Sequence, residues 1–218
     1  IAKHFVAVST NLEITASFGI ADENVFTMWD WVGGRFSLWS AIGLPIALYL
    51  GFDAFEEILE GAFEIDEHFK NAEFENNVPL LMALLSVWNT SFLGYTAQAI
   101  LPYDQALHML PAYLQQGEME SNGKHVTFAG ETVPYTTVPI IWGMTGINGQ
   151  HAFYQCLHQG NVIVPADFIA SIEPQVNVGK HHDILLSNFF AQTEAMMAGV
   201  DAEQVTADLT AKGKSEAE

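Results

Sequence analysis

The chain has 218 residues, of which 50% are apolar and 12% aromatic, so it holds enough material for a folded core. Its 7 Lys and Arg against 26 Asp and Glu leave a net charge of −19. This charge argues against DNA, RNA or an anionic membrane surface as a partner. The single cysteine, Cys156, excludes an internal disulfide and favours a reducing compartment.

The longest apolar stretches, residues 42–52 and 78–88, are too short for a helix that spans a bilayer, which takes roughly 20 residues. The first residues show neither an initiator Met nor the pattern of a signal peptide. We therefore expect no transmembrane segment, and we expect a processed product or an internal piece of a longer chain.

Short apolar runs predict strands, and amphipathic stretches between them predict helices. The predicted strands are residues 5–9, 25–29, 99–102, 139–142 and 162–165, and a helix starts at Thr10 and Asn11 after the first of them. Further helices are predicted over residues 38–50, 55–69, 79–88, 105–116, 150–159 and 181–197. Apolar strands separated by helices predict an α/β fold with a parallel sheet covered on both faces, which is a three-layer αβα arrangement.

The order of polar and apolar segments predicts one main domain with two additions. Residues 122–138, with two Gly-containing turns, predict a β-hairpin insertion. From Asp201 onward the chain becomes polar, which predicts a surface helix and a fraying tail over 201–218. The domain itself is expected to cover residues 1–200.

A Gly-Gly turn after the second predicted strand is the first candidate site. Gly33 and Gly34 let the backbone approach a ligand closely, and Arg35, the one arginine of the sequence, follows them. Ligands of open α/β sheets bind beyond the carboxyl ends of the strands, where a guanidinium suits an anion or a developing oxyanion. The alternative is a plain turn followed by a structural ion pair.

Other motifs carry weaker signals. The Gly-rich turn over 142–151 lacks the spacing of a dinucleotide fingerprint. The adjacent His181 and His182 point to different helix faces and share one ion poorly, so no metal is expected. The acidic residues of 56–67 are expected on a solvated helix face. Cys156 falls within a predicted helix among apolar neighbours, which predicts an inert core thiol.

Five stretches together resemble the glucose-6-phosphate isomerase (phosphoglucose isomerase) family. They are residues 30–43, 100–105, 119–124, 148–155 and 188–195, and the similarity runs almost without gaps from residue 1 to about residue 199. Members of the family are more than twice this length. The resemblance thus implies an internal segment of a sugar-isomerase (SIS) domain, incomplete relative to the full enzyme.

The family reaction interconverts glucose 6-phosphate and fructose 6-phosphate, a step of glycolysis and gluconeogenesis. The sugar ring opens, and a carboxylate base moves a proton between C2 and C1 through an enediolate. The resemblance implies no cofactor, a sugar phosphate as ligand and a mostly cytoplasmic protein, with organellar forms known. An enediolate needs a fixed cation because its charge develops only during the reaction.

Carried over position by position, the similarity is uneven. Arg35 matches the family's enediolate-stabilising arginine, and Gly33 and Gly34 match the glycines beside the sugar. Met144 stands where the family has its catalytic glutamate, and Gln175 stands where it has its ring-opening histidine, which reaches across a dimer interface. A thioether and an amide do not transfer protons near neutral pH. The phosphate-binding loop and the catalytic lysine would lie upstream and downstream of this chain.

Two interpretations stay open. In one, the chain is a catalytically silent relative kept as a structural or interaction subunit, with sugar phosphate bound weakly or not at all. In the other, it is a segment of a working isomerase that other chains or missing sequence complete. The changed residues are those that do chemistry, which favours the silent interpretation. A sheet cut from its neighbours also predicts an obligate partner, as a homo-oligomer or in a larger assembly.

Overall fold

The computed structural model describes residues 4–214, which form two compact units that divide between Trp88 and Asn89. The last four residues of the predicted tail lie outside the described residues. The strands of both units are parallel, which agrees with the predicted α/β class. They form two separate sheets rather than the single one that we expected.

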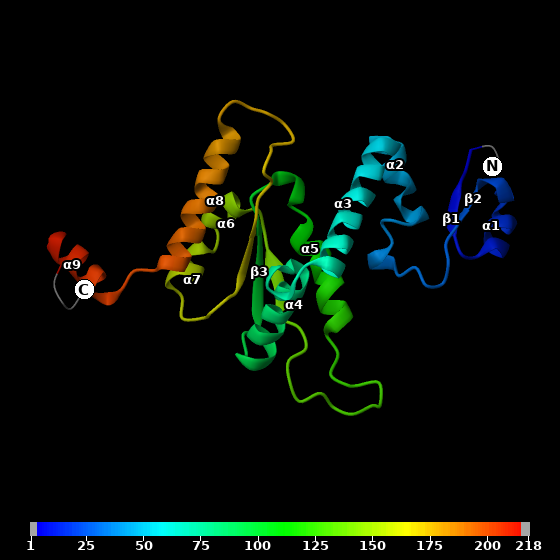
Figure 1. The fold of residues 1–218 in the computed structure, drawn as a ribbon. Helices are drawn as coiled ribbons and strands as arrows, with labels where there is room; N and C mark the ends of the chain where they lie inside the picture. The colour runs from blue at the N-terminus through cyan, green and yellow to red at the C-terminus, as the bar shows by residue number, and fades with distance from the viewer. Residues whose placement is uncertain (1–3, 215–218) are drawn as a thin grey trace. The chain divides into compact units, whose positions relative to one another are not determined.

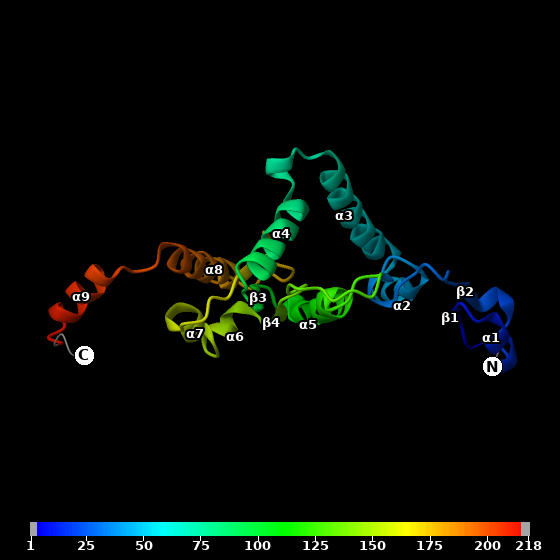
Figure 2. The ribbon, with the colours of Figure 1, turned by 90° about the horizontal axis from the view of Figure 1, so that it is seen from below.

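The first unit is built on a two-stranded parallel sheet and ends in three helices. Strand β1 (Ala7–Ser9) pairs with β2 (Val25–Thr27), so that Ala7 lies beside Val25. Between them in the sequence lies α1 (Leu12–Phe18), which Figure 2 shows beside the two strands. The helix begins after Asn11, whose side chain accepts a hydrogen bond from the Ile14 N–H. The capping residue that the sequence predicted is thus confirmed.

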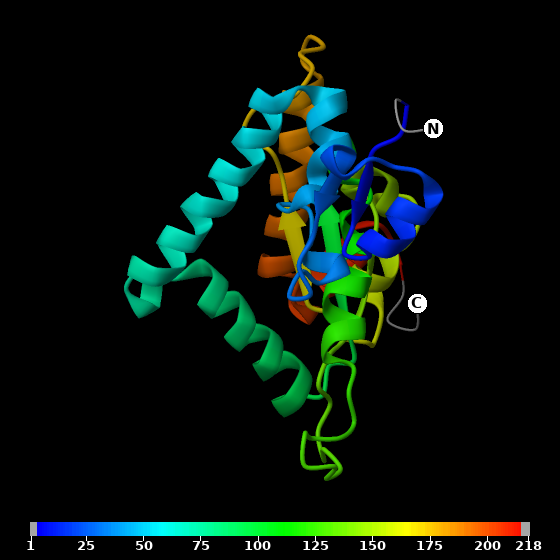
Figure 3. The same cartoon turned by 90° about the vertical axis from the view of Figure 1, so that its right-hand side faces the viewer.

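Three further α-helices complete this unit. They are α2 (Leu44–Leu50), α3 (Phe52–Asn71) and α4 (Val78–Val87), and Figure 3 shows α3 and α4 as the two arms of a V. The helix predicted over residues 38–50 begins later in the structure, at Leu44. Pro45 lies in the first turn of α2, where proline favours the start of a helix, and a 3₁₀ turn, η3 (Ala41–Gly43), comes before it.

The second unit holds a three-stranded parallel sheet with the order β4-β3-β5 (Figure 1). Its strands are β3 (Ala97–Pro102), β4 (Ile140–Gly143) and β5 (Ala166–Ile169). Its helices are η5 (Trp88–Phe92, which starts at the unit boundary), η6 (Gln105–Leu107), α5 (Leu110–Leu114), η7 (Gln115–Glu120), α6 (Gly146–Gln150), α7 (Tyr154–Gln159), α8 (His181–Ala198) and α9 (Ala202–Ala211).

The core of the second unit lies on one face of β3. Ala99 and Leu101 are fully buried there against Tyr154 of α7, with Phe168 of β5 and Met196 of α8 packed around them. Burial of a leucine side chain such as that of Leu101 contributes about 1.5–3 kcal/mol. The central strand β3, with its last four residues buried, is therefore the most deeply buried of the three strands.

Two sequence expectations are wrong in this unit. The strand predicted at 162–165 begins four residues later, because Pro165 has no N–H and takes part in the ladder only through its carbonyl, which accepts from the Ala99 N–H at 2.9 Å. Cys156 is exposed on α7, not buried, since the buried face of that short helix carries Tyr154 instead.

The segment at 122–138 projects from the end of η7 as a long loop (Figure 1). Within it Val126 and Thr132 form an antiparallel bridge, and the Thr127 N–H donates to the Glu131 carbonyl at 2.9 Å. Part of the predicted insertion thus pairs with itself. Within residues 4–214, none of the helices has both the length and the apolar character needed to cross a bilayer.

Candidate functional site

The carboxyl ends of the three parallel strands of the second unit meet at one edge of the sheet. Tyr103 and Asp104 follow β3, Met144 and Thr145 follow β4, and Ser171 comes two residues after β5. Ligands of open parallel sheets bind at this edge because the loops that leave it surround a crevice. These residues are therefore the first place to look for a site.

A cavity of about 510 Å³ lies beside the end of β3. Its polar lining comes from Asp104, Gln105, Gln175, His181 and His182. Tyr103, Ala106, Ile147, Pro174, Val176, Ile184 and Leu185 complete it. None of these lining side chains is a lysine or an arginine, so the cavity by itself offers no fixed cation for a phosphate.

Asp104 joins the loops after β3 and β5. Its Oδ1 accepts from the Ala106 N–H at 2.8 Å and caps η6, while its Oδ2 accepts from the Ser171 hydroxyl. Both carboxylate oxygens are thus engaged. A carboxylate held in this way is a structural link more than an available base.

A buried hydroxyl pair lies under the same edge. Tyr103 is 1% exposed, and its hydroxyl lies 3.0 Å from that of Tyr154 and accepts from the Gln150 amide at 3.1 Å. Burial, with a smaller contribution from Tyr103, raises the pKa of Tyr154 well above its ordinary value. The Tyr154 phenol is therefore neutral near pH 7, and the hydrogen-bonded pair is a rigid part of the structure beneath the strand ends.

Met144 lies directly after β4 and is 38% exposed. It follows Gly143, where φ is 150° and an added Cβ would lie 2.0 Å from the Ile100 carbonyl oxygen. Only glycine fits this close approach to β3. Met144 does not line the cavity that Gln175 lines, so the described structure does not bring these two predicted site residues together in one pocket.

The Gly-Gly turn belongs to the first unit. Gly34 and Arg35 form the 3₁₀ turn η2 (Gly34–Phe36), which the Ser37 hydroxyl closes by donating to the Gly34 carbonyl at 2.6 Å. The half-buried Arg35 follows two stacked indoles, Trp29 and Trp31, whose centroids are 5.8 Å apart. Arg35 thus lies in one compact unit, and Met144 and Gln175 lie in the other.

Sequence reasoning did not single out Asp104 as a site residue, although it is the second residue after a predicted buried strand. It also expected His181 and His182 to face different ways, whereas both line the cavity. The ring of His182 donates from Nε2 to the Ile172 carbonyl at 3.0 Å. For Asp104 the signal was its place just after β3, whose end lies beside the end of β5 once the strands pair. The two histidines are the first residues of α8, and no sequence pattern indicated that both line the cavity.

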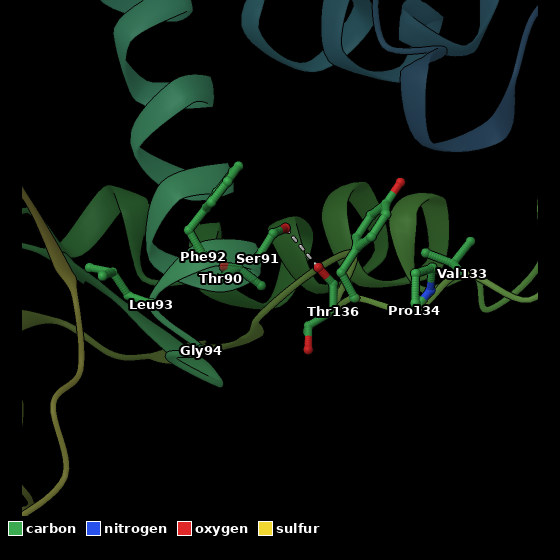
Figure 4. Close-up of a pocket in the computed structure, with 9 residues that line it drawn as sticks. Thr90, Ser91, Phe92, Leu93, Gly94, Val133, Pro134 and Thr136 are labelled. Carbon is green, nitrogen blue, oxygen red and sulfur yellow. Dashed lines mark hydrogen bonds between the residues drawn. The ribbon is translucent and has the colours of Figure 1, made fainter.

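Two further cavities lie in the second unit. Figure 4 shows one of about 520 Å³, lined by residues 90–94 of the η5 region and residues 133–136, which the Ser91 hydroxyl joins by donating to the Thr136 carbonyl at 2.9 Å. Another, of about 660 Å³, lies among α7, α8 and α9 and includes His158, Asp208 and Lys212. The lining of the first has no ionisable acid or base except Tyr135, and the lining of the second includes one lysine, one aspartate and one histidine.

The comparisons with known proteins agree on the family. A family model for phosphoglucose isomerase matches residues 1–217. The chain belongs to the phosphoglucose isomerase family. Its relatives named glucose-6-phosphate isomerase include one from Pseudoalteromonas translucida, 88% identical over the whole chain, and one named glucose-6-phosphate isomerase 1 from Colwellia psychrerythraea, 65% identical over 99% of it.

The chain spans only part of these relatives, 40% and 39% of their lengths. A crystal structure of a glucose-6-phosphate isomerase from Chlamydia trachomatis matches 89% of the chain and 39% of that protein, with a TM-score of 0.78 and 39% identity. A hypothetical protein from Thermus thermophilus matches with a TM-score of 0.66 at 24% identity, which supports the fold alone. The predicted three-layer αβα class, incomplete relative to the full enzyme, is thereby confirmed.

Proposed function

We propose that this chain is the scaffold of an aldose–ketose isomerase site and is catalytically silent by itself. The observation that carries this proposal is Met144 at the end of β4, where the family resemblance implies a glutamate base. A thioether sulfur does not take a proton from carbon near neutral pH. A positioned acid or base contributes about 10²–10⁴-fold to such a reaction, so its absence is a large loss.

Two other side chains of the second unit support this proposal. Asp104, the carboxylate at the neighbouring strand end, has both oxygens engaged by Ala106 and Ser171. Gln175, at the ring-opening position of the family, offers an amide with no useful pKa. In this proposal the chain keeps Arg35, Gly33 and Gly34 as the part of the site that would stabilise an enediolate and approach the sugar.

One observation favours a second function for the protein as a whole. A relative that is 88% identical over the entire chain is named glucose-6-phosphate isomerase. The intact protein would then interconvert glucose 6-phosphate and fructose 6-phosphate in glycolysis and gluconeogenesis, and sequence outside this chain would supply the base and the phosphate-binding groups. In that case Arg35 would stabilise the enediolate charge.

A coupled assay of fructose 6-phosphate conversion separates the two functions. We expect no turnover above background from residues 1–218 alone. Turnover by the intact protein that falls by about 10²–10³-fold in Arg35→Ala would establish the second function. Clear turnover by the chain alone, lost in Arg35→Ala, would overturn the silent proposal.

The same assay tests the substituted base. Met144→Glu restores a carboxylate but none of the groups outside the chain, so we expect no activity from this variant of residues 1–218. Met144→Leu is the matched control, because it keeps the volume and adds no charge. Turnover that appears with glutamate and not with leucine would mean that the base alone was missing.

The surface and charge of the chain support two further expectations. Large apolar side chains are exposed on both units, which favours an obligate protein partner, as a homo-oligomer or in a larger assembly. The net charge of −19 and the absence of lysine and arginine from the cavity lining favour weak or absent binding of sugar phosphate by this chain alone. Cytoplasmic localisation, or an organellar form, stays a prediction.

A further inference from the structure

Residues 171–176, called the wall segment below, form one side of the cavity beside β3. Side chains from two other elements hold the first two residues of this segment. The Ser171 hydroxyl donates to Asp104, and the Ile172 carbonyl accepts from His182 Nε2 at 3.0 Å. Pro174, Gln175 and Val176 follow these two hydrogen bonds and line the cavity.

The wall segment has little else to fix it. It lies between the end of β5 at Ile169 and the start of α8 at His181, outside any helix or strand. The side chain of Ile172 is 91% exposed, so apolar burial does not hold it in place. Each residue that is ordered without regular structure costs conformational entropy, which specific hydrogen bonds have to offset.

The two anchoring residues are themselves firmly placed. Asp104 follows the buried Tyr103 at the end of β3 and caps η6 through its second oxygen. His182 is the second residue of the 18-residue helix α8. The wall segment is therefore tied on one side to the central strand and on the other to the longest helix of the second unit.

We propose that Asp104 and His182 are positioning residues that hold the wall segment, and with it Gln175, against the cavity. Loss of either hydrogen bond would leave the cavity with a mobile side. The effect on the isomerase reaction rests on the proposed function of the intact protein, whereas the ordering of the segment does not.

Hydrogen–deuterium exchange on the intact protein tests the ordering directly. Ser171→Ala and His182→Phe each remove one bond, and we expect amide exchange over residues 173–178 to rise by about 2- to 12-fold in each. His182→Gln keeps an N–H that can donate to the Ile172 carbonyl, so its exchange should stay nearer to that of the wild type. Exchange in β3 should not change in any variant.

Ser187→Ala is the matched control. The hydroxyl of Ser187 also lies on α8, but it donates to the Asp183 carbonyl within the helix. Its removal should leave exchange of the wall segment at the wild-type rate. Wild-type exchange in both Ser171→Ala and His182→Phe, or equal exchange in His182→Phe and His182→Gln, would overturn the proposal.

An activity measurement separates this proposal from the proposed function. If the intact protein isomerises sugar phosphate, kcat/KM should fall in Ser171→Ala and His182→Phe, return partly in His182→Gln and stay unchanged in Ser187→Ala. An inactive wild-type protein would contradict the second function of the intact protein but would leave the exchange result, and thus the positioning roles, standing.

Discussion

Gly146 shows how closely a single residue shapes the strand-end edge of the second unit. A Cβ added at this first residue of α6 would lie 1.9 Å from Cε2 of Tyr103. That ring is buried and its hydroxyl is bonded to Tyr154 and Gln150, so it has little freedom to move. The absence of a side chain at Gly146 thus lets the first turn of α6 pack directly against the Tyr103 ring.

Gly146→Ala should therefore destabilise the protein by about 1–3 kcal/mol, the usual cost of overpacking a core. Urea unfolding followed by tryptophan fluorescence would measure this. Gly117→Ala is the control, because nothing lies within 4 Å of the added Cβ and alanine favours a helix by about 0.5–1 kcal/mol. Equal stability of Gly146→Ala and the wild type would contradict the described packing.

Asp167 of β5 makes the stability of the chain depend on pH. Burial raises the pKa of its carboxyl, against a smaller lowering by the Gln98 amide, which donates to Oδ2 at 2.6 Å. The folded state therefore holds this proton more tightly than the unfolded chain does. Its contribution to stability is present at low pH and is lost as pH rises through the raised pKa.

We expect Asp167→Asn to gain stability relative to the wild type at pH 7 but not at pH 4, because the amide removes the buried charge and can still accept from Gln98. Urea titrations of both proteins at the two pH values would measure the difference. A gain of the same size at both pH values would mean that ionisation of Asp167 is not its cause.

At the scale of elements, helical segments protect the outer edge of β4. The Gln115 amide donates to the Ile141 carbonyl at 3.1 Å, and the Ile141 N–H donates to Met119 Sδ at 3.3 Å. These two side chains take the place of a neighbouring strand. They lie four residues apart on the π-helical turn η7, and a strand edge covered in this way does not pair readily with another chain.

Gln115→Ala should leave the buried Ile141 carbonyl unsatisfied at a cost of about 1–3 kcal/mol. Gln116→Ala provides the comparison, since the exposed Gln116 amide donates to Glu120 on the surface of η7 and its loss should change stability by less than about 0.5 kcal/mol. Both values follow from urea unfolding. Similar losses in the two variants would contradict the role of Gln115 at the strand edge.

At the scale of the whole molecule, both units expose large apolar side chains. Trp31 and Tyr49 are 76% and 89% exposed in the first unit, and Phe92 and Met197 are 71% and 85% exposed in the second. Such a surface favours burial against another chain, while the net charge of −19 opposes close approach of two copies.

We therefore expect residues 1–218 alone to associate, and to associate more strongly as salt screens the charge and sulfate strengthens apolar burial. Light scattering after size-exclusion chromatography, at low and high salt, would measure this. A stable monomer under both conditions would contradict an obligate partner.

Much of the local structure followed from spacing in the sequence. Asn11 caps α1, and the helices predicted at 55–69, 79–88 and 181–197 exist within a few residues of their predicted bounds. The strand predicted at 162–165 was misplaced, because an apolar run that contains a proline does not indicate whether the strand lies before or after that proline. In the structure β5 lies after Pro165. The helix predicted at 105–116 is divided into 3₁₀, α and π turns, which periodicity alone does not distinguish.

From the sequence alone came the α/β class, the parallel strands and the family, together with the prediction that Met144 and Gln175 stand at two catalytic positions of that family. The tertiary structure decided that Gln175 shares a cavity with Asp104, His181 and His182, and that Met144 does not line it. Asp104 and Ser171 are 67 residues apart along the chain, and they meet because β3 and β5 pair in parallel and end at the same edge. Such pairing depends on long-range burial, which local patterns do not encode.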